Sequence, residues 1–183
     1  MSRTLFRTLL ITTTLVLTLG GCGLSQRAMD GGSTIAHGIF YKQVKILHLD
    51  LNARAALNTN STDMSGLSVS TLVRVYQLKD RKSLDAADYE SLLNEGDGVL
   101  ASDLVDSQQL VVKPDEGAQL NVPLSLDAQY VAVVALFRAP DTENGTWRLV
   151  LAREDLEPDQ ARVIELGDNA LNLVPLPKKD SWW

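Results

Sequence analysis

The sequence has few of the side chains that enzymes most often use for chemistry. Its 183 residues include one cysteine, Cys22, and two histidines, His37 and His48. A single thiol cannot close a disulfide within the chain, so stability must come from a hydrophobic core. Neither histidine has a second ligand at metal-binding spacing, and His48 lies between two leucines, which is typical of a strand histidine. We therefore expect no bound metal.

Catalytic sequence motifs are missing as well. The chain contains no Gly-x-Ser-x-Gly, no P-loop, no dinucleotide fingerprint and no His-Glu-x-x-His. The sequence therefore predicts a protein that is not an enzyme, with no small-molecule substrate and no cofactor apart from a covalent lipid. One alternative stays open from the sequence alone, namely a lipid-anchored periplasmic ligand-binding module or cell-wall hydrolase.

Basic residues are also in short supply outside the N-terminal segment. The whole chain has 17 basic and 23 acidic residues, and two of the basic residues, Arg3 and Arg7, lie before residue 22. Without residues 1–21 the chain has 17 − 2 = 15 basic residues and a formal charge of −8. This balance argues against binding nucleic acid or anionic lipid head groups through charge.

What the chain does have is a lipoprotein signal at its N-terminus. Arg3 and Arg7 precede an apolar segment at 9–19, and small residues then lead to Cys22 in the run Leu-Gly-Gly-Cys. The apolar segment is short and ends in two glycines, which argues against a membrane-spanning helix. We predict that residues 1–21 are a signal peptide and that Cys22 is lipidated. Because Gly23 is not the aspartate that favours inner-membrane retention, we expect the anchor in the inner leaflet of the outer membrane, facing the periplasm.

The residues after the lipidation site divide into three predicted parts. Residues 22–38 are rich in glycine and serine and predict a flexible tether. Residues 39–177 have the length and apolar content of one domain. Residues 178–183 are predicted to form a C-terminal tail, which includes Trp182 and Trp183.

Apolar residues in the domain recur mostly with the period of strands. Eight segments predict strands, at 44–51, 69–78, 110–113, 118–126, 130–137, 147–151, 162–166 and 171–176. The continuously apolar run at 130–137 predicts a central strand, with Val133, Val134 and Leu136 in the core. One segment, Asp85 to Leu93, predicts a helix that Asp85 caps and that Asn94, Gly96 and Gly98 end. The pattern predicts a mainly β protein, a two-sheet β-sandwich with a helical insertion after the second strand.

The connection between the first two predicted strands is long. It runs from residue 58 to residue 68, and eleven residues exceed the usual length of a hairpin loop. Met64 and Leu67 are apolar in an otherwise polar segment, so they are candidate anchors at a partner surface. The loop comprises Asn58, Thr59, Asn60, Ser61, Thr62, Asp63, Met64, Ser65, Gly66, Leu67 and Ser68.

Several segments together resemble a known family. They are the run Leu-Val-Arg-Val-Tyr-Gln-Leu-Lys-Asp at 72–80, the helix at 85–93, the segment 100–105, and Ala-Val-Val-Ala-Leu-Phe-Arg at 132–138 followed by Trp147-Arg148. In this order, and with the lipoprotein signal, they resemble the TssJ/SciN family of type VI secretion outer-membrane lipoproteins. The resemblance covers roughly residues 44–173, and it departs from the family pattern at 68–70 and 114–117, which affects loop geometry only.

This resemblance implies a transthyretin-like sandwich and a role in assembly. It implies an outer-membrane lipoprotein that binds the periplasmic domain of TssM and, with TssL in the same complex, helps to build the type VI secretion membrane complex. It further implies that loop 58–68 carries much of the contact with TssM.

Overall fold

The computed structural model describes residues 43–60 and 66–177. Cys22, Gly23, the predicted tether at 22–38, the predicted tail at 178–183 and loop residues 61–65 lie outside the described residues. The division into signal peptide, tether, domain and tail therefore stays a prediction, and the described residues belong to a compact unit that begins at Gln43.

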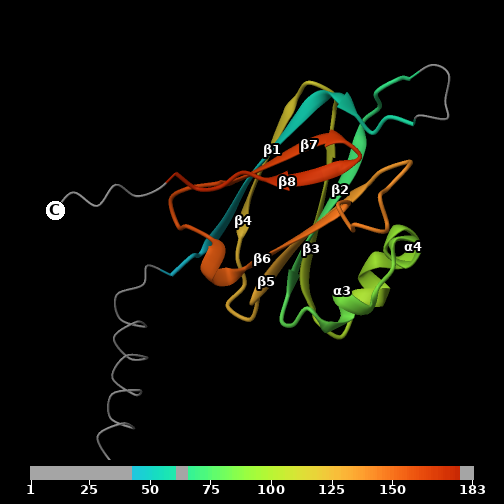
Figure 1. Cartoon of the computed structure of the whole chain (residues 1–183). Helices are drawn as coiled ribbons and strands as arrows, with labels where there is room; N and C mark the ends of the chain where they lie inside the picture. Colours follow the sequence, from blue (N-terminus) through green and yellow to red (C-terminus); the bar gives the residue numbers. More distant parts are fainter. Residues whose placement is uncertain (1–42, 61–65, 178–183) are drawn as a thin grey trace, which may run out of the picture. The chain divides into compact units, whose positions relative to one another are not determined.

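Eight strands form two four-stranded sheets, which confirms the predicted sandwich (Figure 1). The first sheet has the order β4-β1-β7-β8, with β4 at Gly117–Pro123, β1 at Ile46–Leu57, β7 at Arg162–Asp168 and β8 at Ala170–Leu173. The second has the order β3-β2-β5-β6, with β3 at Leu104–Val112, β2 at Thr71–Leu78, β5 at Tyr130–Leu136 and β6 at Arg148–Ala152. Within the described residues, β1 and β7 pair in parallel, whereas the other paired strands are antiparallel. A short 3₁₀ turn, η1 at Arg153–Asp155, follows β6.

The core fills the space between the sheets and also lies beneath the helices. Val73 and Val75 of β2 are buried on the side that faces the other sheet, where Gln77 donates to the carbonyl of Pro123 at the end of β4. Successive side chains of a strand point to opposite faces, so Arg74 and Tyr76 lie on the helix side. The central strand β5 is covered on both sides, which explains why it is apolar throughout.

The single predicted helix is wrong in detail, because the insertion contains two helices. They are α3 at Lys82–Ala86 and α4 at Tyr89–Leu100. Asp88, not Asp85, caps α4, since its side chain accepts a hydrogen bond from the N–H of Ser91. Asp85 lies within α3, where its carboxylate pairs with Arg81.

The sequence predicted that Gly96 and Gly98 would end the helix, but both residues lie within α4. The helix kinks at Glu95, whose φ of −138° and ψ of 46° are not helical, and then continues to Leu100. At the kink, the guanidinium of Arg74 donates to the carbonyls of Leu92 and Leu93. Gly96 sits so close to Tyr76 that an added Cβ would collide with the phenol oxygen, so glycine fits this position without a shift of Tyr76.

Two strands, β3 and β4, have limits that differ from those predicted from the sequence. The predicted segment 110–113 is the last part of the longer strand β3, which pairs with β2 along its length. The predicted segment 118–126 ends at Pro123 in β4, although the N–H of Leu124 still bonds to the carbonyl of Lys45, next to the last ladder pair of Ile46 and Pro123. In the predicted core, Val133 and Val134 are fully buried, but Leu136 is only partly buried.

The sandwich has two distinct ends. At the tether end, the described chain begins at Gln43 just before β1, and Val174 after β8 bonds to Val163 near the start of β7. At the opposite loop end lie the β1–β2 connection, the β3–β4 turn, the β5–β6 loop and the β7–β8 turn. The twelve residues of β1 connect the two ends. At about 3.3 Å per residue they span roughly 35 Å.

Candidate functional site

The predicted binding loop is described at both of its stems. Asn58, Thr59 and Asn60 follow β1, and Gly66, Leu67 and Ser68 lead towards β2. The remaining predicted contact residues, Ser61, Thr62, Asp63, Met64 and Ser65, lie outside the described residues. The lipidation residue Cys22 and the sorting residue Gly23 also lie outside them.

Asn58 fixes the first stem of the loop from inside the domain. It is 2% exposed and has a φ of 51°, a left-handed conformation that asparagine tolerates better than most residues. Its amide nitrogen donates to the carbonyl of Ser70, and its side-chain oxygen accepts from the N–H of Arg138 at 2.7 Å. Its own N–H donates to the carbonyl of Asp168. Asn58 therefore anchors the loop from within.

Arg138 joins the two stems of the loop. Its guanidinium donates to the carbonyl of Asn58 through Nε at 3.3 Å and Nη2 at 3.0 Å, and Nη2 also donates to the carbonyl of Leu67 at 3.0 Å. Asn169 adds a bond to the carbonyl of Thr59 at 3.0 Å. We call this set of contacts between Arg138, Asn58 and Leu67 the Arg138 clamp. Because the planar guanidinium can bridge two acceptors, the clamp holds the stems at a fixed separation.

The clamp presents an apolar side chain to solvent. Leu67 is 63% exposed, and Gly66 next to it has a φ of 56°, in the left-handed region that favours glycine. An exposed leucine on a fixed backbone has less freedom to lose on binding than one on a free loop. This geometry suits a contact with another protein.

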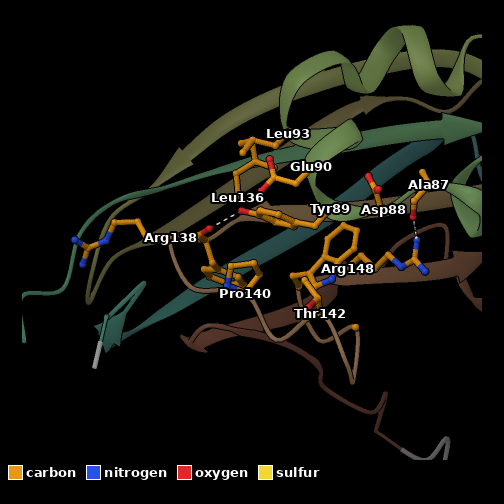
Figure 2. A pocket seen from close by; sticks show the side chains of 13 residues that line it. Ala87, Asp88, Tyr89, Glu90, Leu93, Leu136, Arg138, Pro140, Thr142 and Arg148 are labelled. Atoms are coloured by element: carbon orange, nitrogen blue, oxygen red, sulfur yellow. Dashed lines mark hydrogen bonds between the residues drawn. The ribbon is translucent and has the colours of Figure 1, made fainter. Parts of the chain in front are cut away.

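A hollow of about 580 Å³ lies beside the clamp (Figure 2). Its walls come from the start of α4, the end of β5 and the β5–β6 loop. The lining residues are Ala87, Asp88, Tyr89, Glu90, Leu93, Leu136, Phe137, Arg138, Pro140, Thr142, Gly145, Trp147 and Arg148. We call it the helix–loop hollow.

Two polar groups in the walls of the hollow have partners within the domain. The hydroxyl of Tyr89 donates to the carbonyl of Phe137, and Arg148 donates to the carbonyls of Leu84 at 2.7 Å and Ala87 at 3.1 Å. The ring of Trp147 packs edge-on against Tyr89, with centroids 5.1 Å apart, and Arg148 lies over the same ring. These contacts fix the walls and leave mainly apolar side chains towards the opening.

Two titratable groups of the hollow, Tyr89 and Asp88, are unsuited to acid–base catalysis near neutral pH. Burial raises the pKa of Tyr89 to about 12, so its phenol stays protonated. Hydrogen bonds from the side chain and backbone N–H of Ser91 lower the pKa of Asp88, so its carboxylate stays charged. A general acid or base needs a pKa near the working pH.

The described part of the chain contains neither a candidate metal site nor a candidate membrane-spanning helix. Over residues 43–60 and 66–177, no group of three or more His, Cys, Asp or Glu side chains could hold a metal ion. His48 instead bonds to Asn121 on the neighbouring strand. None of the helices in these two ranges has the length and apolar content needed to cross a membrane.

Together, these features define a class of protein: a two-sheet β-sandwich that carries an exposed leucine on a loop stem held by the Arg138 clamp. Comparison with known families identifies the family. The family described as "Type VI secretion lipoprotein, VasD, EvfM, TssJ" matches residues 45–169. The chain belongs to this family of type VI secretion lipoproteins, which confirms the resemblance read from the sequence motifs.

Solved structures agree with this assignment. The chain is 41% identical to a chain of the structure described as "Type VI membrane complex", with a TM-score of 0.68, covering 73% of this chain and 100% of that one. It is 39% identical to a chain of the structure described as the T6SS protein TssM C-terminal domain from EAEC, with a TM-score of 0.66 and coverage of 73% and 100%. The T6SS lipoprotein TssJ1 from Pseudomonas aeruginosa is 26% identical, with a TM-score of 0.60 and coverage of 73% and 99%. No curated protein matches the chain.

Family membership decides between the two classes that the sequence left open. The family is a structural, non-enzymatic component of type VI secretion, so the prediction that this protein is not an enzyme is confirmed. The hydrolase alternative has no support from the site.

Two features of the site were missed from the sequence, although a signal for them was present. Arg138 and Arg148 appeared only as parts of the Phe-Arg and Trp-Arg motifs. An arginine directly after the buried strand β5, and another beside a tryptophan, are placed to donate to backbone carbonyls at a sheet end. Which carbonyls they reach depends on residues far away in the sequence.

Proposed function

We propose that this chain is anchored in the inner leaflet of the outer membrane through a lipid on Cys22 and binds the periplasmic domain of TssM through loop 58–68. In this role it helps to build the type VI secretion membrane complex, which also contains TssL. The observation that carries the proposal is the Arg138 clamp, which fixes the loop stems at the end of the sandwich opposite Gln43. The similarity to chains in structures described as the TssM C-terminal domain and the type VI membrane complex supports the choice of partner.

The position of the loop suits a lipid-anchored protein. The chain reaches the domain at the tether end, and β1 carries it to the loop end before the loop begins. Gly23 to Gly38 would extend up to ~50 Å at ~3.3 Å per residue, so the anchor does not hold the domain tightly against the bilayer. The loop stems lie at the end of the described domain opposite Gln43, so the loop would stay accessible to a periplasmic partner.

Replacing the loop tests this function directly. We would replace Thr59 to Leu67 by a short Gly/Ser link and keep Asn58, because that residue is part of the fold. The sandwich should persist, since closure entropy changes slowly with loop length. Binding of the full-length protein in detergent to the isolated TssM periplasmic domain, measured by calorimetry, should fall below detection.

The matched control changes another connection at the same end. Lys113 and Glu116 form an exposed ion pair in the β3–β4 turn, and replacing both by alanine should leave the affinity unchanged. Equal affinity of the loop variant and the natural chain would place the TssM contact elsewhere on the domain.

A further inference from the structure

The helix–loop hollow shares one residue with the clamp. Arg138 contributes to the wall of the hollow, and its guanidinium holds the carbonyls of Asn58 and Leu67. In Figure 2 the side chain of Arg138 points away from Tyr89 and Leu136, so the same residue faces the hollow on one side and the loop on the other. The loop stems and the hollow therefore adjoin each other at the loop end.

The loop alone is small for a stable protein interface. Specific interfaces bury about 800 Å² on each partner and involve roughly 20–30 residues of each. The loop has eleven residues, and Asn58, one of them, is buried inside the domain. A partner that binds the loop tightly must cover neighbouring surface as well, and the hollow is the adjoining concave surface.

The chemistry of the hollow selects its occupant. Tyr89, Leu136, Pro140 and Trp147 line it, and Leu93 on its rim is 36% exposed. The Tyr89 hydroxyl and the Arg148 guanidinium are occupied by backbone carbonyls, so apolar side chains make up most of what remains for a ligand. Apolar or aromatic side chains seated in such pockets carry much of the binding energy of interfaces.

The charge around the hollow adds a second preference. Asp88 caps α4 and Glu90 lies in its first turn, whereas Arg138 and Arg148 line other parts of the hollow, so the acidic side chains are confined to its α4 side. The chain beyond residue 21 has a formal charge of −8 from 15 basic and 23 acidic residues. A partner segment with lysine or arginine beside its apolar residue would meet a complementary field, which raises the rate of association more than the affinity.

We propose that the helix–loop hollow seats an apolar side chain of the protein that binds loop 58–68, within a segment that also carries basic residues. This inference rests on the proposed function, because the occupant belongs to the same periplasmic partner. It makes the start of α4 and the β5–β6 loop a second contact region, joined to the first through Arg138.

Two substitutions at the rim test the hollow without touching the clamp. Thr142 is exposed, so Thr142→Trp should fill the opening while the domain stays folded. Leu93→Ala removes an exposed apolar wall. Each should weaken binding of the TssM periplasmic domain about tenfold or more, with a melting temperature close to that of the natural chain. The control is Leu126→Ala, which removes a 75% exposed leucine at the tether end and should leave affinity unchanged.

A charge variant tests the second part of the inference. Glu90→Gln should slow association at low salt by about two- to threefold and lose this effect at high salt, since exposed charges are screened. The control is Glu143→Gln, which changes an acidic residue of the β5–β6 loop that does not line the hollow. It should slow association less than Glu90→Gln does.

The outcomes separate this inference from the proposed function. If the natural chain binds, the loop replacement does not, and both Thr142→Trp and Leu93→Ala bind normally, the hollow is no part of the interface and the inference is wrong. If the natural chain fails to bind the TssM domain at all, the proposed function itself fails. Loss of binding in both rim variants, with Leu126→Ala unaffected, supports the inference.

Discussion

At each end of the sandwich one arginine donates to several backbone carbonyls, but the two arginines have different structural roles. At the tether end, Arg153 donates to the carbonyls of Ser125 and Ala128 through Nη1, and to that of Val44 through Nη2. At the loop end, Arg138 donates to the carbonyls of Asn58 and Leu67. Each guanidinium collects backbone carbonyls from segments that are far apart in the sequence.

The difference lies in what each arginine holds. The segments around Arg153 include the buried residues Val44 and Ala128, so that arginine closes the core where the chain enters. The segments around Arg138 lead to exposed Leu67 and to the helix–loop hollow. An arginine that satisfies carbonyls can therefore complete a fold at one place and fix a recognition surface at another, and the neighbouring side chains decide which.

Replacing each arginine by alanine should separate these two roles, and this is the largest effect that we predict. Arg153→Ala should lower the free energy of unfolding by about 2–3 kcal/mol, because part-buried carbonyls lose a charged donor, and leave TssM binding unchanged. Arg138→Ala should cost less stability, since its side chain is exposed, but weaken binding at least tenfold. Urea unfolding and calorimetry measure the two quantities.

Arg138→Lys is the control for charge. A lysine ammonium keeps the charge but lacks the planar fork, so binding should recover only in part. The proposed difference between the two arginines would be wrong if Arg153→Ala reduced TssM binding as strongly as Arg138→Ala did.

A smaller effect should follow from changing one exposed apolar side chain. Leu67→Asp should weaken TssM binding, since a desolvated carboxylate replaces a candidate anchor. Val111→Asp is the matched control, because Val111 is 58% exposed on the edge strand β3 and lies outside the clamp and the hollow. Calorimetry on both variants checks this, and equal losses would mean that the effect comes from added negative charge alone.

The smallest effect that we predict depends on pH at the start of α4. The hydrogen bonds from Ser91 hold the folded pKa of Asp88 below its ordinary value of 3.8. Its contribution to stability is therefore present above that value and is lost as the pH falls through the lower folded pKa. Asp88→Ala should lower the melting temperature at pH 7, and the difference from the natural chain should shrink near pH 3. A difference that stays constant between pH 7 and pH 3 for Asp88→Ala would contradict the capping role.

Local pattern was enough to predict the sandwich but not its details. The alternation along β4 and the continuous apolar run of β5 placed two strands correctly, since periodicity reports burial. The C-terminal part of α4 was missed because Gly96 and Gly98 normally end a helix. Here Arg74 takes the carbonyls of Leu92 and Leu93, and α4 continues past its kink. Tertiary contacts overrode local preference.

The contact of loop 58–68 with a partner stays a prediction, whereas the contacts that hold the stems of the loop were not predicted from the sequence. Length and composition pointed to loop 58–68, and Leu67 was named as an anchor. The clamp was out of reach, because Arg138 and Asn58 are 80 residues apart and no local pattern relates them. The inward position of Asn58 was hidden for the same reason, since asparagine in a loop is ordinarily exposed.

The position of β1 between the two ends of the sandwich has a mechanical consequence. β1 begins just after Gln43 and ends just before the loop, and it lies between β4 and β7 in its sheet. Tension applied between the membrane anchor and a partner bound at the loop would run along this one strand. A strand is already almost fully extended at about 3.3 Å per residue and offers little slack. Because both points of load lie at the ends of the same extended strand, the covalent backbone of β1 would carry the pull and its hydrogen-bonded neighbours would bear little of it, so the sandwich would transmit the pull without unravelling.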